Sequence, residues 1–414
     1  MLRSVTLLGS SSGRNAGDAA LLSSIMDSVD EACGTKLLYE IPTLKPEFIW
    51  QTYENRVRPI GILPWNFSAK LFGLPTYQSL MRTDLSLVFD ATLFDRSLYN
   101  PFFNFLSSYN ALLPLAKKKG KRMACYTVSI GPVSTPKGKD MLRRVLEMMD
   151  FISVRDQDAV DMMRDAGVQN PNVIITNDVA LNTKPASPER IEAIWRTFGF
   201  DPSKEVLAIN MNPYFDSWAG LNRDPLTKDQ FVDIYSRGLK LALKDIDANL
   251  LFVSTQHLDV TLTREVMSRI DTGHRKAFFS NTEYNHHEIK GVMGKVNLLF
   301  AMRLHCLILT SSALGPIASL NYLPKVTTYM KSLGLSDYAL SFENFNPEAI
   351  GAHVLKSWND RGSIRRKLEE LIPQMQYEAN KAAELVAVMH RGEDVGQALA
   401  RLKSEPRGMR VANA

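Results

Sequence analysis

Short runs of apolar residues alternate along the chain with longer stretches in which apolar positions recur at helical spacing. This alternation is typical of strands joined by helices in parallel α/β sheets. We expect a first series of strands at residues 4–9, 85–89, 122–128, 151–154 and 172–176. A second series is expected at residues 205–210, 249–254, 296–301 and 317–320.

A polar linker with two prolines, at residues 182–188, separates the two series of strands. The chain has 414 residues, and a single core stops growing at about 250–300 residues. We therefore expect two α/β domains, with the carboxyl edges of their sheets facing a shared cleft. The expected parts are an N-terminal domain at 1–184, a C-terminal domain at 189–360, a helical tail at 363–402 that is broken or kinked at Pro373 and packs back on the first domain, and a disordered end at 403–414.

Composition narrows the class of protein. The net charge of +5 suits an anionic substrate or an anionic membrane surface and is too small to imply nucleic acid. The three cysteines lie far apart and show no metal-ligand spacing, which fits a reducing compartment. We see no signal-peptide layout and no run near the ~20 apolar residues of a membrane span. We expect a cytoplasmic protein, with contact at the inner face of the membrane as an open alternative.

Candidate chemistry gathers where two successive strands of the second series end. Arg303 and His305 follow the apolar run 296–301 at the point where a helix is expected, and Lys325 lies in the loop after the strand 317–320. Ligands of open α/β sheets bind at this edge, and a helix N-terminus beside an arginine favours anions. The alternative is that Arg303 and Lys325 are surface charges and His305 is a partly buried structural histidine.

Polar residues also follow strands of the first series. The glycine-rich turn at 9–18 carries Asn15 and Asp18 and could bring backbone amides close to an anion, but it is neither a Walker A loop nor a dinucleotide fingerprint. A simple loop with Asp18 as a helix cap is the alternative. Arg155 follows the strand 151–154 and could bind a carboxylate or phosphate. Its alternative is an ion pair with Asp156 or Asp158.

Two further segments call for a structural interpretation. The run His286-His287-Glu288 lacks the spacing of a metal site, and a loop or helix start is favoured. The segment 56–82 mixes basic, aliphatic and aromatic residues and is compatible with contact to a membrane surface. A buried irregular insert is the favoured interpretation of this segment.

Over about residues 5–340 the sequence resembles the polysaccharide pyruvyl transferases. The motifs that carry the resemblance are, in order, Asn15-Ala16-Gly17-Asp18, Ser129-Ile130-Gly131-Pro132, Ser153-Val154-Arg155-Asp156, Gly167-Val168, Asp178, Arg303-Leu304-His305 and Tyr322-Leu323-Pro324-Lys325. One departure is the segment 90–95, where many members of the family carry a glycine-rich turn.

The resemblance implies a GT-B-like pair of Rossmann-like domains and transfer of a pyruvyl group from phosphoenolpyruvate to two hydroxyls of a sugar. The product would be a cyclic ketal of a polysaccharide or cell-surface glycan, with release of phosphate. The first domain would be the acceptor side and contribute Arg155, and the second would be the donor side. No metal and no cofactor are implied.

The same resemblance assigns roles to individual residues. Arg155, Arg303 and His305 are the expected catalytic residues, with His305 as general acid or base, because imidazole exchanges protons near neutral pH. The expected substrate-binding groups are Asn15, Asp18, the backbone N–H of Leu304 and Lys325. A GT-B glycosyltransferase that uses a nucleotide sugar and a non-catalytic glycan-binding relative remain the alternatives. Whether the acceptor is lipid-linked and what the oligomeric state is stay open.

Overall fold

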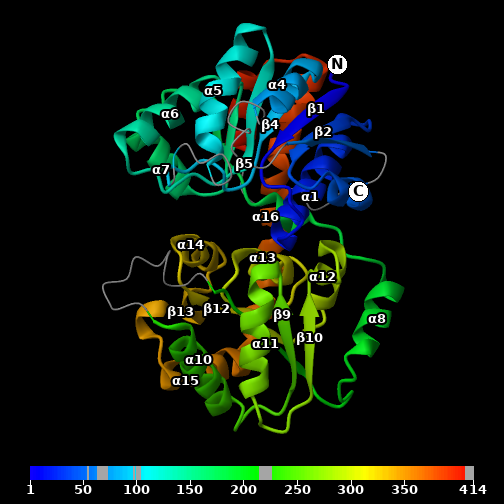
Figure 1. Ribbon diagram of the computed structural model, residues 1–414, viewed down its shortest axis with the longest axis vertical. Helices are drawn as coiled ribbons and strands as arrows, with labels where there is room; N and C mark the ends of the chain where they lie inside the picture. The colour runs from blue at the N-terminus through cyan, green and yellow to red at the C-terminus, as the bar shows by residue number, and fades with distance from the viewer. Residues whose placement is uncertain (54–55, 63–72, 97, 99–103, 214–225, 406–414) are drawn as a thin grey trace. The chain divides into compact units, whose positions relative to one another are not determined.

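The computed structural model describes residues 1–53, 56–62, 73–96, 98, 104–213 and 226–405. The chain divides into two compact units, and Figure 1 shows an α/β sheet with flanking helices in each. Unit 1 comprises Met1–Gly13, Leu21–Asn182 and Gln374–Ala414, and unit 2 comprises Arg14–Ala20 and Thr183–Pro373. The first turn of helix α1 is thus counted with unit 2, although the strand before it belongs to unit 1.

The described residues of unit 1 form a parallel sheet in the order β3-β2-β1-β4-β5-β6-β7. The strands are β1 (Ser4–Leu8), β2 (Leu38–Thr43), β3 (Val57–Gly61), β4 (Leu85–Val88), β5 (Arg122–Val128), β6 (Ile152–Val154) and β7 (Val173–Ile175). The helices are α1 (Ala16–Cys33), α2 (Pro46–Tyr53), α4 (Gly73–Arg82), α5 (Phe105–Lys118), α6 (Pro136–Glu147), α7 (Gln157–Asp165), a 3₁₀ helix η2 (Val179–Asn182), most of α16 (Arg361–Arg391) and α17 (Val395–Ser404). Strand order reverses between β1 and β4.

Unit 2 repeats this plan with the order β10-β9-β8-β11-β12-β13, again parallel among the described strands. Its strands are β8 (Val206–Asn210), β9 (Asn249–Ser254), β10 (Lys276–Ser280), β11 (Leu298–Ala301), β12 (Ile317–Asn321) and β13 (Ala339–Ser341). Its helices are α8 (Pro188–Thr197), α10 (Lys228–Ala242), η3 (His257–Asp259), α11 (Val260–Arg269), α12 (His286–Met293), α13 (Leu304–Ser311), α14 (Pro324–Ser332), η4 (Ser336–Tyr338), η5 (Phe342–Asn344) and α15 (Pro347–Asn359). Here the order reverses between β8 and β11.

Apolar periodicity explains why these elements form. The strands β4, β8, β9 and β11 are buried at every position, as continuous apolar runs in parallel sheets predict. Helix α1 buries the apolar face that the sequence predicts, and all five of its members are inaccessible to solvent: Leu21, Leu22, Ile25, Met26 and Val29. In unit 2 the rings of Phe231, Tyr235, Phe300 and Phe345 stack beside the sheet. The predicted α/β class with two sheets is confirmed.

Four strands were not predicted, and the interpretation of residues 56–82 was wrong over the part that the structure describes. Strands β3, β10 and β13 lie at sheet edges, where short, polar and proline-bearing strands are tolerated. In strand β2, Glu40 interrupts the run of apolar residues that would have marked the strand in the sequence. Its buried carboxylate pairs with Arg82 at 2.9 Å. Residues 57–61 and 73–82 are therefore β3 and α4 rather than an irregular insert, while 63–72 lie outside the described residues.

The C-terminal helices belong largely with unit 1. Helix α16 continues through Pro373, so the helix does not break there, and the kink that was the other expectation stays a prediction. The guanidinium of Arg122 donates to the carbonyl of Met389 at 3.0 Å, and the amide of Gln376 donates to the carbonyl of Leu181 at 2.9 Å. Helix α17 reaches Ser404, and the segment 406–414, predicted to be disordered, falls outside the described residues.

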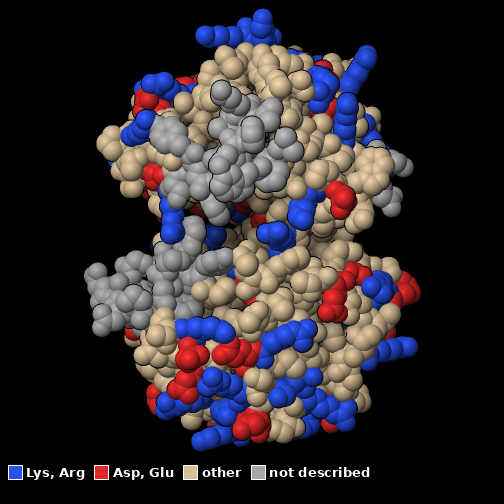
Figure 2. Space-filling view, in the orientation of Figure 1, with Lys and Arg blue, Asp and Glu red and all other residues tan. Residues whose placement is uncertain are grey.

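The outer surface of unit 2 carries both signs of charge. On the face drawn in Figure 2, basic and acidic side chains are interspersed in the lower part. Salt bridges join Lys228 to Glu265, and Lys240 to Asp271 at 2.6 Å. Among the described residues, no helix is both long enough and apolar enough to cross a bilayer.

Candidate functional site

The carboxyl ends of β8 and β11 meet at the point where strand order reverses in unit 2. Such a switch point is where ligands bind in open α/β sheets. Figure 1 shows the arrowheads of β9 and β10 pointing to the end of the sheet where α12 and α13 lie. Asn210, the last residue of β8, is buried there. Its Oδ1 accepts a hydrogen bond from the backbone N–H of Arg303 at 3.0 Å, and its Nδ2 donates to the carbonyl of Val253 at 3.0 Å.

Arg303 is held at its other end by a carboxylate that sequence reasoning missed. The guanidinium donates from Nε to Oδ2 of Asp259 at 2.9 Å and from Nη2 to Oδ1 at 2.5 Å. The side chain of Asp259 is fully buried, whereas that of Arg303 is 17% exposed. Burial raises the pKa of the Asp259 carboxyl, and the charge of Arg303 opposes that rise. The arginine predicted from the strand-to-helix junction is thus fixed at both its backbone and its side chain.

His305 lies in the first turn of α13 and contacts the first turn of α1. A Cβ atom added at Gly17 would overlap the imidazole ring of His305, so only glycine leaves room for this approach. The segment before Gly17 is bound to the same sheet edge: Ala16 N–H donates to the carbonyl of Thr255 at 2.8 Å, and His257 N–H donates to that of Arg14 at 3.0 Å. The structure therefore brings the Asn15–Asp18 motif and His305 together within unit 2.

Three of the other predicted substrate-binding residues lie at the starts of helices α1 and α13. Asn15, rather than Asp18, caps α1, because its Oδ1 accepts from the N–H of Gly17 at 2.9 Å. Asp18 is buried in the first turn of the helix. Leu304 is the first residue of α13, with Arg303 at the N-cap position, so its N–H belongs to the turn that lacks intrahelical partners.

Lys325 does not lie in a loop, as the sequence predicted, but in the first turn of α14, where it is exposed. Proline at the first helical position is pre-organised for a helix, which explains why α14 begins at Pro324. Close to this turn, Nδ2 of Asn212 donates to the hydroxyl of Tyr322, a residue that is nearly fully buried. Burial raises the pKa of Tyr322 to about 12. Tyr322 is thus a neutral group near Arg303.

Arg155 lies in unit 1, where it follows β6 and is 7% exposed. Its guanidinium pairs with Asp178, whose side chain is 6% exposed, and not with Asp156 or Asp158 as the alternative interpretation expected. Asp156 instead caps α7 by accepting from Ala159 N–H at 2.9 Å. Burial opposes the charge of Arg155, but Asp178 and Asp90 outweigh it and raise the pKa of the guanidinium. Donor binding by Arg155 stays a prediction.

Asp90 occupies the position where the family resemblance suggested a glycine-rich turn. It follows β4 and has φ of 66°, in the left-handed region that glycine favours. Aspartate enters that region more readily than most residues because its short side chain can hydrogen-bond locally. The backbone path expected of a glycine is therefore kept here, while a carboxylate is added at the switch point of the first sheet.

Arg155→Ala tests whether this arginine is structural. Removing it leaves Asp178 buried without its cation, and we expect the free energy of unfolding to fall by about 3 kcal/mol. Asp178→Asn added to Arg155→Met should recover most of that loss, because the Oδ1 of residue 178 can still accept from Ala180 N–H. Denaturant unfolding measures both. Equal stability of Arg155→Ala and the parent would show that the pair is dispensable to the fold.

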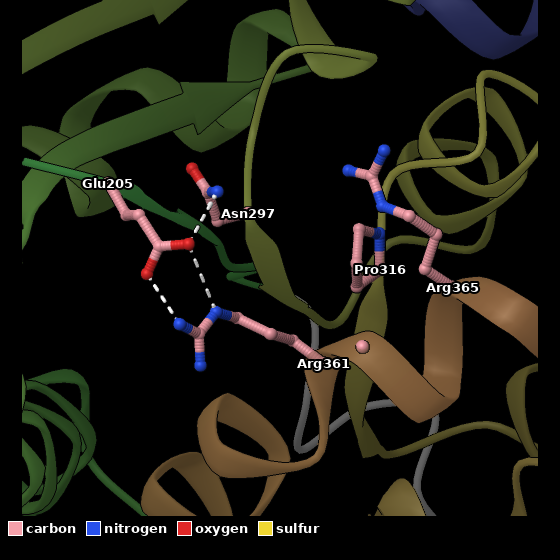
Figure 3. A pocket seen from close by; sticks show the side chains of 6 residues that line it. Glu205, Asn297, Pro316, Arg361 and Arg365 are labelled. Carbon is pink, nitrogen blue, oxygen red and sulfur yellow. Dashed lines mark hydrogen bonds and ion pairs between the residues drawn. The ribbon is translucent and has the colours of Figure 1, made fainter.

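A pocket of about 540 Å³ opens at the amino ends of β8, β11 and β12, the opposite edge of the same sheet. Figure 3 shows Asn297 and Arg361 both pointing at Glu205, with Arg365 apart from them beside Pro316. Arg361 Nη2 donates to Glu205 at 2.6 Å, and Asn297 Nδ2 donates to it at 2.9 Å. This pocket contains none of the predicted site residues. No group of His, Cys, Asp and Glu suited to a metal ion occurs in the part of the chain that the structure describes.

Comparison with known proteins finds a family match for this chain. The sequence profile of a family described as "Polysaccharide pyruvyl transferase" matches residues 15–323, which include both Asn15 and Arg303. None of the curated proteins compared with the chain matches it.

Solved structures share the two-sheet fold at low identity. UDP-GlcNAc 2-epimerase from Neisseria meningitidis is 12% identical with a TM-score of 0.63, over 95% of this chain and 100% of that one. HepE from Anabaena, solved with UDP and glucose, is 11% identical with a TM-score of 0.57, over 97% and 98%. A glycosyltransferase from Rickettsia africae is 11% identical with a TM-score of 0.55, over 98% and 100%. These likenesses establish the GT-B-like fold alone.

Proposed function

Because the chain belongs to the polysaccharide pyruvyl transferase family, we propose that it transfers the pyruvyl group of phosphoenolpyruvate onto two hydroxyls of a sugar. The product is a cyclic ketal on a polysaccharide or cell-surface glycan precursor, and inorganic phosphate is released. The observation that carries the proposal is the fixed Arg303 beside His305 at the switch point of the second sheet. A guanidinium recognises carboxylate and phosphate alike, and the donor has both.

The reaction proceeds in two additions at one carbon. A proton added to the methylene carbon of phosphoenolpyruvate makes a methyl group and leaves positive charge on the neighbouring carbon. A sugar hydroxyl attacks that carbon and loses its proton. The bond from this carbon to the phosphate oxygen then breaks, phosphate leaves with one proton, and a second hydroxyl attacks and closes the ring. The two hydroxyl protons balance the one on the methyl group and the one on phosphate.

The residues of unit 2 supply the functions that these steps need. His305 is the proton donor or acceptor, since it is the histidine that adjoins Arg303 in the first turn of α13. Arg303 anchors the anionic donor, Lys325 adds a second cation at the same sheet edge, and the Leu304 N–H supports developing negative charge on oxygen. Asn15 and Asp18 bind substrate from the α1 side. The contribution of Arg155 to the donor is part of the same proposal and rests on the family resemblance.

Phosphate release from phosphoenolpyruvate, measured with a panel of sugar acceptors, tests the proposed activity. We expect release only when an acceptor with two suitably placed hydroxyls is present, and we expect the acceptor to gain the mass of pyruvic acid less water. Nucleotide sugars serve as the comparison. Release of nucleotide from a nucleotide sugar, with phosphoenolpyruvate left intact, would instead identify a glycosyltransferase. Binding of glycan with neither reaction would identify a non-catalytic relative.

A further inference from the structure

Asp259 is the last residue of the 3₁₀ helix η3, which leads directly into α11. Its backbone is helical, with φ of −82° and ψ of −19°, and its side chain accepts no hydrogen bond from α11. The Asp259 carboxylate instead binds the Nε and Nη2 atoms of Arg303, a residue 44 positions away.

Stability alone is a poor explanation for the pair. The Asp259 side chain is fully buried, and burial raises its pKa, which means that the charged form is disfavoured where it lies. Buried ion pairs often contribute less to stability than apolar side chains of the same volume. The pair is also asymmetric, because Arg303 keeps part of its surface open to solvent while Asp259 keeps none. A buried carboxylate under a partly exposed guanidinium suits an arginine that has to be presented in one orientation.

Arg303 is held at its backbone as well as at its guanidinium. Asn210 accepts from its backbone N–H, and that amide is itself tied to β9 through Val253. Asp259 in turn is fixed by its own backbone, since its N–H donates to the carbonyl of Gln256 at 3.0 Å and its carbonyl accepts from the hydroxyl of Thr263 at 2.8 Å. The Nε and Nη2 atoms of the guanidinium therefore both face the Asp259 carboxylate.

We propose that Asp259 is a positioning residue for the reaction, which orients the guanidinium of Arg303 toward the anionic donor. This inference rests on the proposed function. Asp259 touches no substrate and acts through Arg303. It also offsets the charge of the arginine, so that the donor is selected by the direction of the hydrogen-bond donors and less by excess positive charge.

Asp259→Asn is the main test, because it keeps the shape and removes the charge. An amide nitrogen then faces an N–H of Arg303, and the guanidinium loses its fixed orientation. We expect kcat/KM for phosphoenolpyruvate to fall about 10- to 100-fold, since small misplacements of a binding group have effects of that size. Affinity for inorganic phosphate, measured by calorimetry, should become tighter, because a negative charge has been removed. A variant that is merely less stable would lose both together.

A double-mutant cycle with Arg303→Lys shows whether Asp259 acts through the arginine. If it does, Asp259→Asn changes kcat/KM less than about 3-fold in the Arg303→Lys background, because the coupled residues are not additive. Additive losses would overturn the inference. The matched control is Glu205→Gln, which breaks a carboxylate–arginine pair at the opposite edge of the same sheet (Figure 3) and should leave kcat/KM unchanged.

Two further outcomes keep the inference separate from the proposed function. If the parent protein releases no phosphate from phosphoenolpyruvate with any acceptor, the proposed function fails, and the phosphate titrations still test Asp259. Equal phosphate affinity of parent and Asp259→Asn, together with unchanged salt dependence, would then refute any influence on Arg303. If Asp259→Asn does not fold, Asp259→Glu keeps the charge and displaces the guanidinium, and its kcat/KM should fall by a similar factor. Parent-like kcat/KM in Asp259→Glu would contradict positioning.

Discussion

His305→Ala is expected to lose about 10²- to 10⁴-fold in kcat while phosphoenolpyruvate still binds with nearly parental affinity. The size follows from what a positioned acid or base typically contributes. The affinity is kept because a proton-transfer group acts chiefly in the transition state, while Arg303 and Lys325 bind the donor in the ground state. Steady-state kinetics at saturating donor, with calorimetry for binding, measures the two effects separately.

The matched control for this prediction is His257→Ala. His257 is exposed at the same sheet edge and contributes its backbone N–H to Arg14, a contact that alanine retains. We expect it to turn over like the parent. More than about a tenth of parental kcat in His305→Ala would refute proton transfer by this residue. Weaker donor binding with a small change in kcat would instead make His305 a hydrogen-bond donor to the phosphate.

Arg303→Ala is expected to have two effects at once. Donor affinity should fall about 10- to 150-fold, which corresponds to the roughly 1.5–3 kcal/mol of a hydrogen bond to a charged group. The free energy of unfolding should also fall by about 3–5 kcal/mol, because Asp259 is left fully buried without its cation. Calorimetric titration and denaturant unfolding of the same preparation measure the two effects.

Removing both charges separates binding from stability. In Arg303→Met combined with Asp259→Leu, no uncompensated charge is buried, so most of the lost stability should return. Donor affinity should remain low, because the anchor is still absent. If affinity returned together with stability, Arg303 would have mattered only to the fold. If Arg303→Ala bound phosphoenolpyruvate as tightly as the parent, the donor would not lie at this residue.

The sequence was informative where local pattern decides structure. A continuous apolar run followed by Arg303 and His305 predicted a buried strand that leads into a helix, and β11 and α13 have that form. The parallel sheet then determined that these side chains lie at a carboxyl edge. Lys325 was predicted to lie in a loop but lies in helix α14, because Pro324 was not recognised as the start of a helix.

What could not be predicted depends on contacts between distant parts of the chain. Nothing in the sequence marks Asp259, and only the fold shows that its carboxylate binds an arginine 44 residues away. The approach of Gly17 to His305 joins residues 288 positions apart, and a single glycine gives no sign of its partner. Arg155 was correctly seen as a residue that could be ion-paired, but the nearby Asp156 caps a helix, and Asp178, on the next strand–loop unit, is the partner.

Cys306, the residue after His305, gives the protein a built-in reporter of local opening. Its thiol is fully buried, and burial raises its pKa, so it reacts with a thiol reagent only while the start of α13 is transiently open. The rate of Cys306 modification under native conditions thus reports how often this helix opens. Cys125, which is equally buried in β5 of unit 1, is an internal reference on the same chain. A donor that binds at α13 should slow the modification of Cys306 and leave the modification rate of Cys125 unchanged. Donor binding can therefore be measured without an acceptor sugar and without turnover.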